Sequence, residues 1–190
     1  MVSPLAKVPS FSAVPTTLPG VILLDPVVYR DGRGFFFESY SERAMADAGI
    51  PDRFVQDNHS FSTRNVVRGL HYQIGSPQGK LVRVIGGEIF DVAVDLRRGS
   101  PTFGKWYGAI LSGDNNLMMW IPSGLAHGFS VLSEEAHVLY KATGFYAPEL
   151  ERTIAWNDRE LAIDWRLQAE PVISAKDARG ASFRAAETFE

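Results

Sequence analysis

The side chains of this sequence that could do chemistry are histidines that stand close to basic residues. His71 lies in the segment RGLHYQ, residues 68–73, and Lys80 lies in the segment QGKLVR, residues 78–83. If Arg68, His71 and Lys80 occupy adjacent strands of one sheet, two cations and an imidazole share one cleft. That arrangement is costly unless the cleft binds an anion. The pattern therefore predicts an anionic small molecule as the ligand.

A histidine, a lysine and a tyrosine together can move protons. Neutral imidazole is a general base near pH 7, and a carboxylate that fixes its tautomer also stabilises the imidazolium that forms. A lysine can stabilise an enolate, and a tyrosine can return a proton from the opposite face. The spacing does not choose the carboxylate, because Asp91, Asp95 and Asp177 are all candidates. Proton transfer is the predicted chemistry.

Metal and thiol chemistry find little support in the sequence. It contains no cysteine, which excludes disulfides, thiolate zinc sites, iron–sulfur clusters and thiol catalysis. Jelly-roll proteins often bind a metal through two histidines two residues apart, but His71 is followed at that spacing by Gln73. No glycine-rich phosphate loop is present either. We therefore expect no metal and no cofactor.

The composition is that of a soluble globular protein. The 190 residues suffice for one domain, 45% of them are hydrophobic, and no stretch approaches the roughly 20 apolar residues of a spanning helix. A net charge of −3 without a basic block argues against nucleic acid and anionic membranes as partners. Prolines interrupt the first 20 residues, which makes a poor signal peptide and predicts a cytoplasmic protein. We expect an arm at residues 1–19 and one domain at residues 20–190.

The elements that must position these residues are predicted to be strands. Short apolar and β-branched runs bounded by Gly, Pro, Asn and Asp recur through the sequence. They cover residues 21–29, 35–40, 66–73, 81–85, 89–96, 106–111, 118–121, 128–132 and 138–143. One helix is expected between Ser41 and Gly49, and a second near residues 178–188. Many short strands and little helix predict an all-β jelly-roll barrel or sandwich.

The ordered motifs of the chain identify a family that it resembles, the dTDP-4-dehydrorhamnose 3,5-epimerases. The resemblance extends from about residue 20 to residue 177. The motifs are RDGRGFFFES (30–39), FVQDNHS (54–60), VVRGLHYQ (66–73), QGKLVRVIGGEIFDVAVDLR (78–97), SPTFGKW (100–106), IPSGLAHGF (121–129), LYK (139–141), YAPELE (146–151), IAWND (154–158) and SAKD (174–177).

This resemblance implies a fold, an assembly and a reaction. The fold is a cupin-type jelly roll, and the assembly is a homodimer that exchanges N-terminal strands. The reaction is the cofactor-free conversion of dTDP-4-dehydro-6-deoxy-D-glucose to dTDP-4-dehydro-L-rhamnose, in dTDP-L-rhamnose biosynthesis. Protons are removed at C3 and C5, which both lie next to the C4 carbonyl.

The resemblance also implies roles for individual residues. His71 is the base, Asp177 is its partner, Tyr140 is the acid and Lys80 lies near the enolate oxygen. Arg68 contacts the diphosphate, whose oxygens suit its planar fork. The substrate-binding residues implied in this way are Arg33 and Glu38, which come from the partner subunit, and Gln56, Asp57, Asn58, Arg68, His127, Glu151 and Lys176.

Two departures from the family pattern stand out, and three other functions stay open. Phe145 replaces a tyrosine found in many relatives, and His137 is predicted to be exposed on the opposite strand face from Tyr140. One alternative is a mono-epimerase that acts at C3 or C5 alone. The others are a metal-dependent cupin enzyme and a sugar-nucleotide-binding module without catalytic activity.

Overall fold

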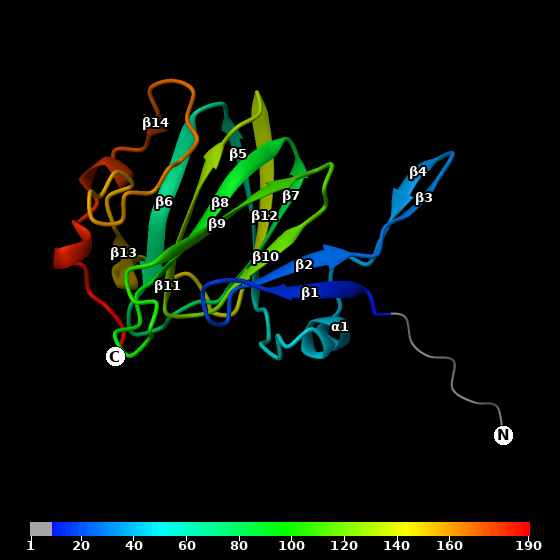
Figure 1. The fold of residues 1–190 in the computed structure, drawn as a ribbon, viewed down its shortest axis with the longest axis horizontal. Coiled ribbons are helices and arrows are strands. Elements are labelled where there is room, and N and C mark those ends of the chain that lie inside the picture. Colours follow the sequence, from blue (N-terminus) through cyan, green and yellow to red (C-terminus); the bar gives the residue numbers. More distant parts are fainter. Residues whose placement is uncertain (1–8) are drawn as a thin grey trace.

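Two six-stranded β-sheets face each other across the interior of the molecule (Figure 1). The computed structural model describes residues 9–190. The strand order in sheet I is β1 (Phe11–Pro15), β2 (Ile22–Pro26), β10 (Met118–Ile121), β7 (Lys80–Gly86), β12 (Glu135–Ala142) and β5 (Gln56–Thr63). In sheet II it is β13 (Glu151–Thr153), β6 (Val66–Gln73), β11 (Leu125–Val131), β8 (Glu88–Asp95) and β9 (Trp106–Ser112), with β14 (Val172–Ile173) parallel to β6. The predicted all-β, cupin-type jelly roll is confirmed.

The central strands of sheet II are buried on both faces. Their inner faces pack against sheet I, and their outer faces are covered by the segment that follows β13, through Ile154, Leu161, Trp165 and Phe183. Strands of this kind show nearly continuous apolar runs. In β8 and β11 the residues Asp91 and His127 interrupt such runs, and both are buried.

The strand predictions differ from the structure mainly at the polar strands. The bounds of β6 and β10 are as predicted, but β1 and β5 were not predicted. β5 reads QDNHSFST, and its residues alternate between partly buried and exposed positions, so it lacks an apolar run. β1 lies inside the predicted arm and pairs with β2. The strand predicted over residues 35–40 ends at Phe36, where β4 (Gly34–Phe36) stops after pairing with β3 (Tyr29–Asp31).

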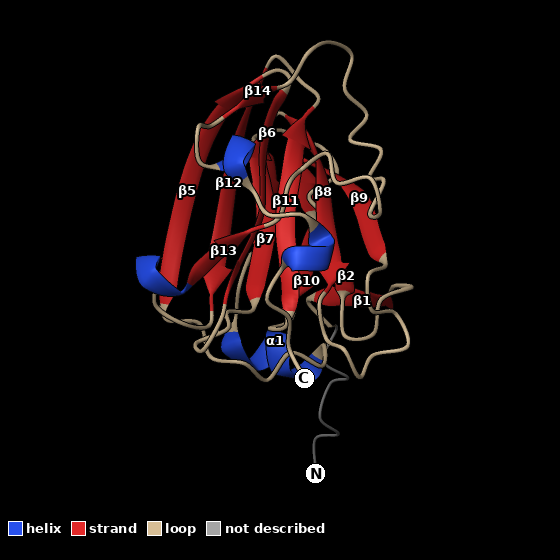
Figure 2. Cartoon of the chain, turned by 90° about the vertical axis from the view of Figure 1, so that its left-hand side faces the viewer, coloured by secondary structure: helices blue, strands red, loops and turns tan. Residues whose placement is uncertain are grey.

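The helices are short and lie at the periphery (Figure 2). α1 (Glu42–Asp47) confirms the first predicted helix, and the Ser41 side chain caps it by accepting a hydrogen bond from the Ala44 N–H. The second prediction is wrong, because residues 178–188 form no α-helix. They contain two 3-10 turns, η2 (Asp177–Arg179) and η3 (Phe183–Ala185), separated by extended backbone; a third turn, η1 (Pro148–Leu150), precedes β13. No helix within residues 9–190 is long and apolar enough to cross a membrane.

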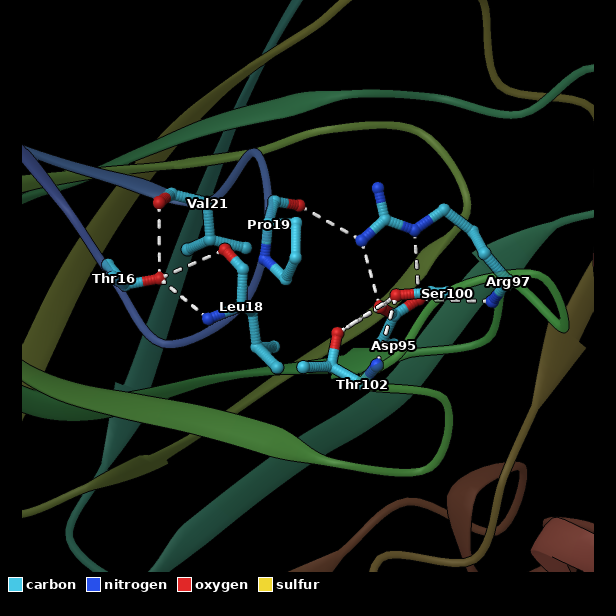
Figure 3. Close-up of polar contacts among 8 residues, drawn as sticks. All are labelled: Thr16, Leu18, Pro19, Val21, Asp95, Arg97, Ser100 and Thr102. Carbon is cyan, nitrogen blue, oxygen red and sulfur yellow. Dashed lines mark hydrogen bonds and ion pairs between the residues drawn. The ribbon is translucent and has the colours of Figure 1, made fainter.

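A buried carboxylate ties the N-terminal segment to sheet II (Figure 3). Asp95, at the end of β8, accepts hydrogen bonds from Arg97, Ser100 and Thr102 over 2.6–2.9 Å. Arg97 also donates to the Pro19 carbonyl over 2.9 Å. Burial of Asp95 opposes its ionisation, but these hydrogen bonds outweigh that effect and lower its pKa to about 2. Asp95 is thus a carboxylate with a structural role.

Replacing this carboxylate should destabilise the fold in a pH-dependent way. A folded pKa near 2 lies below the unfolded value of about 3.9, so the stabilisation is present above pH 4 and is lost as the pH falls toward 2. We expect Asp95→Asn to lower the free energy of unfolding by about 2 to 3 kcal/mol at pH 7. Urea unfolding at pH 7 and pH 3 measures the difference. Asp114→Asn, at an exposed turn residue, is the control, and equal losses in both variants would contradict the interpretation.

Candidate active site

An open cavity of about 340 Å³ lies between the two sheets. Side chains from both sheets and from the loops after β12 and β14 line it. Most of the residues that the sequence singled out lie in its wall: Gln56, Asn58, Arg68, His71, Lys80, His127, Tyr140, Glu151 and Lys176. The cavity therefore gathers predicted residues from segments that are far apart in the chain.

Two histidines lie side by side in the sheet II wall. The register of β6 and β11 places His71 opposite His127, so both side chains lie on the same face of the sheet. The strands approach closely next to this pair, where a Cβ on Gly69 would lie 2.6 Å from the Gly128 Cα. Gly69 also has a φ of +122°, which favours glycine. The local backbone thus depends on glycines beside the histidines.

His71 forms a dyad with Asp177. Its Nε2 lies 2.7 Å from Asp177 Oδ1, and Asp177 Oδ2 accepts a hydrogen bond from the Gly69 N–H. Burial opposes the ionisation of Asp177, but its contacts with His71 and Gly69 outweigh burial and hold its pKa below the ordinary value. An ionised carboxylate only accepts hydrogen bonds, so Nε2 carries the hydrogen and Nδ1 is the basic nitrogen. Asp177 is 3% exposed and His71 24%, so solvent reaches only the histidine.

A lysine and a tyrosine come from sheet I, on the opposite wall, so Lys80 faces His71 from another sheet and does not share one sheet with it and Arg68 as expected. Lys80 donates to the His71 carbonyl over 3.4 Å. Burial lowers the pKa of Lys80 to about 8, although Glu151 and Asp91 raise it. Burial also raises the pKa of Tyr140, so its phenol stays protonated at neutral pH. The cavity thus has an imidazole base on one wall and a phenol acid on the other.

The remainder of the cavity wall is polar and hydrogen-bonded. Arg68 donates to the Ser62 hydroxyl and to the Phe61 carbonyl. The Gln56 side chain donates to Asn58 over 2.9 Å. Lys176 donates to Glu151 over 2.8 Å. Because these groups are already positioned by one another, they offer an ordered set of donors and acceptors to a polar ligand.

Two cavity features were missed in the sequence. The Tyr146 hydroxyl donates to Glu151 over 2.8 Å and the ring lines the cavity, whereas the neighbouring Phe145 is 71% exposed. The position of Tyr146 at the start of the motif YAPELE was the available signal. Among the candidate carboxylates, Asp91 pairs with His127, whose Nε2 lies 2.7 Å from Asp91 Oδ1. Residue spacing did not indicate that pairing.

Three predicted binding residues lie outside the cavity in this chain. Arg33 and Glu38 are exposed, and Arg33 forms an ion pair with Asp31 in the β3–β4 hairpin. Asp57 is also exposed, on the outer face of β5, and accepts hydrogen bonds from Lys141. The single chain does not bring these residues to the others.

His137 is a correction to the sequence analysis. It lies on β12 three residues before Tyr140, but it is half-buried and not exposed as predicted. Its Nδ1 lies 3.0 Å from the Nε2 of His59 on β5, and its ring contacts Phe61. Neighbouring rings on an edge strand therefore cover it.

The described residues contain no cluster of side chains arranged as metal ligands. Residues 9–190 contain no group of three or more His, Asp or Glu side chains that could hold one. The imidazoles of His71 and His127 are each bound by a carboxylate through Nε2. The donor set suits proton transfer better than metal binding.

Comparison with known proteins places the chain in a family. The family model for dTDP-4-dehydrorhamnose 3,5-epimerase matches residues 15–185. The chain is 62% identical to the enzyme of that name from Pseudomonas aeruginosa, over 90% of this chain and 96% of the relative, and 53% identical to the one from Salmonella typhimurium, over 87% and 91%. A crystal structure of the Legionella pneumophila dTDP-6-deoxy-D-glucose-3,5-epimerase with dTDP-4-keto-L-rhamnose has a TM-score of 0.90 and 49% identity, over 93% of this chain and 95% of that one. The chain belongs to the dTDP-4-dehydrorhamnose 3,5-epimerase family and is an isomerase of that class.

Proposed function

We propose that the cavity converts dTDP-4-dehydro-6-deoxy-D-glucose to dTDP-4-dehydro-L-rhamnose by proton transfer at C3 and C5, as a step of dTDP-L-rhamnose biosynthesis. One observation carries the proposal: the His71–Asp177 dyad and the Tyr140 phenol lie on opposite walls of one cavity. Inversion at carbon requires that a proton leave one face and another arrive at the opposite face. A sugar ring held between these walls meets a base on one side and an acid on the other.

The proposed mechanism is the same at both carbons. His71 removes the proton next to the C4 carbonyl, and Asp177 stabilises the imidazolium. The electron pair left by the C–H bond moves to the C4 oxygen, and the Lys80 ammonium stabilises that enolate. Tyr140 then donates its proton to the opposite face. Solvent takes the proton from His71 and restores the one on Tyr140, so the enzyme returns to its starting state without gain or loss of electrons.

The polar part of the cavity is proposed to bind the nucleotide. Arg68 suits the diphosphate because its guanidinium presents parallel donors to phosphate oxygens. Gln56 and Asn58 offer amides to the base, with Asp57 beside them on the same strand. The remaining proposed contacts to the substrate are His127, Glu151 and Lys176. Arg68 and Lys176 would supply the local positive charge that an anionic substrate needs in a chain whose net charge is −3.

A homodimer with exchanged N-terminal strands is part of the proposal. The β3–β4 hairpin projects from the body of the chain (Figure 1), and its aromatic residues Tyr29, Phe35 and Phe36 are 60%, 52% and 71% exposed. Such exposed aromatic residues favour a protein contact. A partner subunit on this hairpin would receive Arg33 and Glu38 in its own cavity. A cytoplasmic location, and the division into residues 1–19 and 20–190, also stay predictions.

Loss of the base should abolish proton exchange. The substrate is incubated with protein in deuterium oxide, and the C3 and C5 proton signals are followed separately by NMR. We expect His71→Asn to slow both losses by about 10²- to 10⁴-fold, the usual contribution of a general base. The control is His137→Asn, which removes a half-buried histidine outside the cavity.

The same experiment separates the alternatives. Loss of a single signal from the unmodified protein favours a mono-epimerase. Loss of neither signal, with dTDP still bound, favours a binding module. Activity that chelator removes and added metal restores favours a metal-dependent enzyme. Full exchange by the His71→Asn variant would contradict the proposed base.

Removal of the acid should uncouple exchange from inversion. In Tyr140→Phe, His71 can still remove a proton and return deuterium to the same face, so exchange continues without change of configuration. We expect inverted product to fall by about 10²- to 10⁴-fold while exchange at one carbon or both persists. Trapping the product with a stereospecific reductase measures inversion. Tyr107→Phe, on β9, is the control, and a parallel loss of exchange and inversion in Tyr140→Phe would argue against the assignment.

Strand exchange predicts complementation between inactive variants. In a mixed dimer of Arg33→Ala and His71→Asn subunits, one cavity has a native His71 and receives a native Arg33 from its partner. We therefore expect mixing, after unfolding and refolding together, to restore up to about half of the activity per mixed dimer. If Arg33 instead served its own cavity, no cavity in the mixture would be complete. Activity that stays at the level of the separate variants would contradict the exchange.

A further inference from the structure

Asp91 is a buried carboxylate for which the proposed mechanism has no use. It lies on β8 and is 0% exposed. In the register of β8 and β11 it stands opposite Phe129, and His127 stands opposite Ala93, so Asp91 and His127 share the inner face of sheet II. Asp91 therefore lies buried beside the cavity, as a second carboxylate paired with a second histidine.

The hydrogen bonding of Asp91 is incomplete, unlike that of Asp95 on the same strand. Both oxygens of Asp95 accept hydrogen bonds from Arg97 and the neighbouring hydroxyls. Asp91 Oδ1 pairs with His127, but Oδ2 has no hydrogen-bond partner among the described residues. An unpartnered buried carboxylate oxygen is costly, and nearby positive charge is what offsets such a cost.

The nearby positive charge is that of Lys80. Asp91 acts on the Lys80 ammonium and favours its charged form, against burial. Lys80 also acts on His127, whose pKa is lowered by burial and raised by Asp91. The titratable groups around Lys80 come from several elements, namely His71, Asp91, His127, Tyr140, Glu151 and Lys176. Among these, Asp91 is the carboxylate that contacts the second histidine.

The Asp91 contact also orients the imidazole of His127. A carboxylate accepts hydrogen bonds, so the hydrogen resides on Nε2 of His127. Nδ1 then carries the lone pair, and it is the nitrogen left for a ligand in the cavity. With the ring held neutral by burial, Nδ1 accepts a hydrogen bond, which suits a hydroxyl of the sugar.

We propose that Asp91 is a positioning residue of the reaction: it fixes the His127 ring with Nδ1 toward the substrate and keeps the Lys80 ammonium charged beside the C4 oxygen. This inference rests on the proposed function. In this proposal, a residue on the inner face of β8 sets the charge of Lys80, and the His71–Asp177 dyad has the separate role of removing the proton.

The first test is the pH profile of Asp91→Asn, which keeps the shape and the accepting oxygen but removes the charge. In the unmodified protein the rate should fall as the pH rises through about 8, where Lys80 loses its proton. Removing a negative charge lowers the pKa of Lys80, so the fall should move to lower pH by about one unit. A shift of the Lys80 pKa from about 8 to about 7 lowers its protonated fraction at pH 7.5 by about threefold, so we expect kcat at that pH to drop by about threefold, with the Kd for dTDP unchanged.

Asp95→Asn is the matched control, because it removes an equally buried carboxylate from the same strand. It should lower the melting temperature and leave the pH profile in place. An unshifted profile in Asp91→Asn, or the same shift in Asp95→Asn, would overturn the proposal. Absence of any proton exchange by the unmodified protein is a different result, since it would remove the proposed function itself.

A second measurement is made on the unmodified protein and does not depend on whether Asp91→Asn folds. Two-bond ¹H–¹⁵N NMR spectra of the unmodified protein report which ring nitrogen of His127 carries hydrogen, and His127→Gln identifies its signals. Hydrogen on Nε2, with Nδ1 unprotonated at neutral pH, is the expected result. Hydrogen on Nδ1 with Nε2 unprotonated would overturn the proposal whatever the kinetics show.

Discussion

The hydrogen bond between Asp177 and His71 is the contact on which the organisation of this molecule depends. It joins residues 106 positions apart, so the chain must return over the outer face of sheet II before the dyad can form. The parallel pairing of β14 with β6 and the bridge between Ile154 and Ala181 fix that return. Burial of Trp165 and Phe183 against sheet II stabilises it. Much of the apolar packing on the outer face of sheet II therefore serves to place one carboxylate.

The cavity holds its ionisable groups in different protonation states by giving each a different neighbour. Burial disfavours every charged form, and it raises the pKa of Tyr140 and lowers those of Lys80 and His127. The pKa of Asp177 is lowered in spite of burial, because its hydrogen bonds favour the carboxylate. A protonated phenol, a lysine close to its own pKa and carboxylate-bound imidazoles can then coexist at neutral pH. That separation would let the proposed acid and the proposed base work in one small volume.

The sequence predicted the apolar strands well and the contacts between distant segments poorly. The bounds of β6 and β10 follow from local apolar patterns. β5 was not predicted because it is a polar strand without an apolar run. Helix propensity over residues 178–188 was overridden by the packing of Phe183 against the outer face of sheet II. Among three candidate carboxylates, family resemblance identified Asp177, but register alone reveals that Asp91 faces His127. Which side chains meet across two strands depends on the strand order and register, and residue spacing along the chain does not determine either one.

Under the proposed dimer, this chain would build one end of the cavity by itself and the other end only with its partner. The proposed proton transfer needs its reacting groups held to within a fraction of an ångström, and strands of the two sheets supply that rigidity to His71 and Tyr140. The β3–β4 hairpin has two short strands and exposed aromatic residues, and an isolated hairpin is marginally stable in water. Its conformation is therefore best maintained by contact with another surface. Under the proposed dimer, that contact would also complete the nucleotide end of the cavity, so assembly and substrate binding would be stabilised by the same residues.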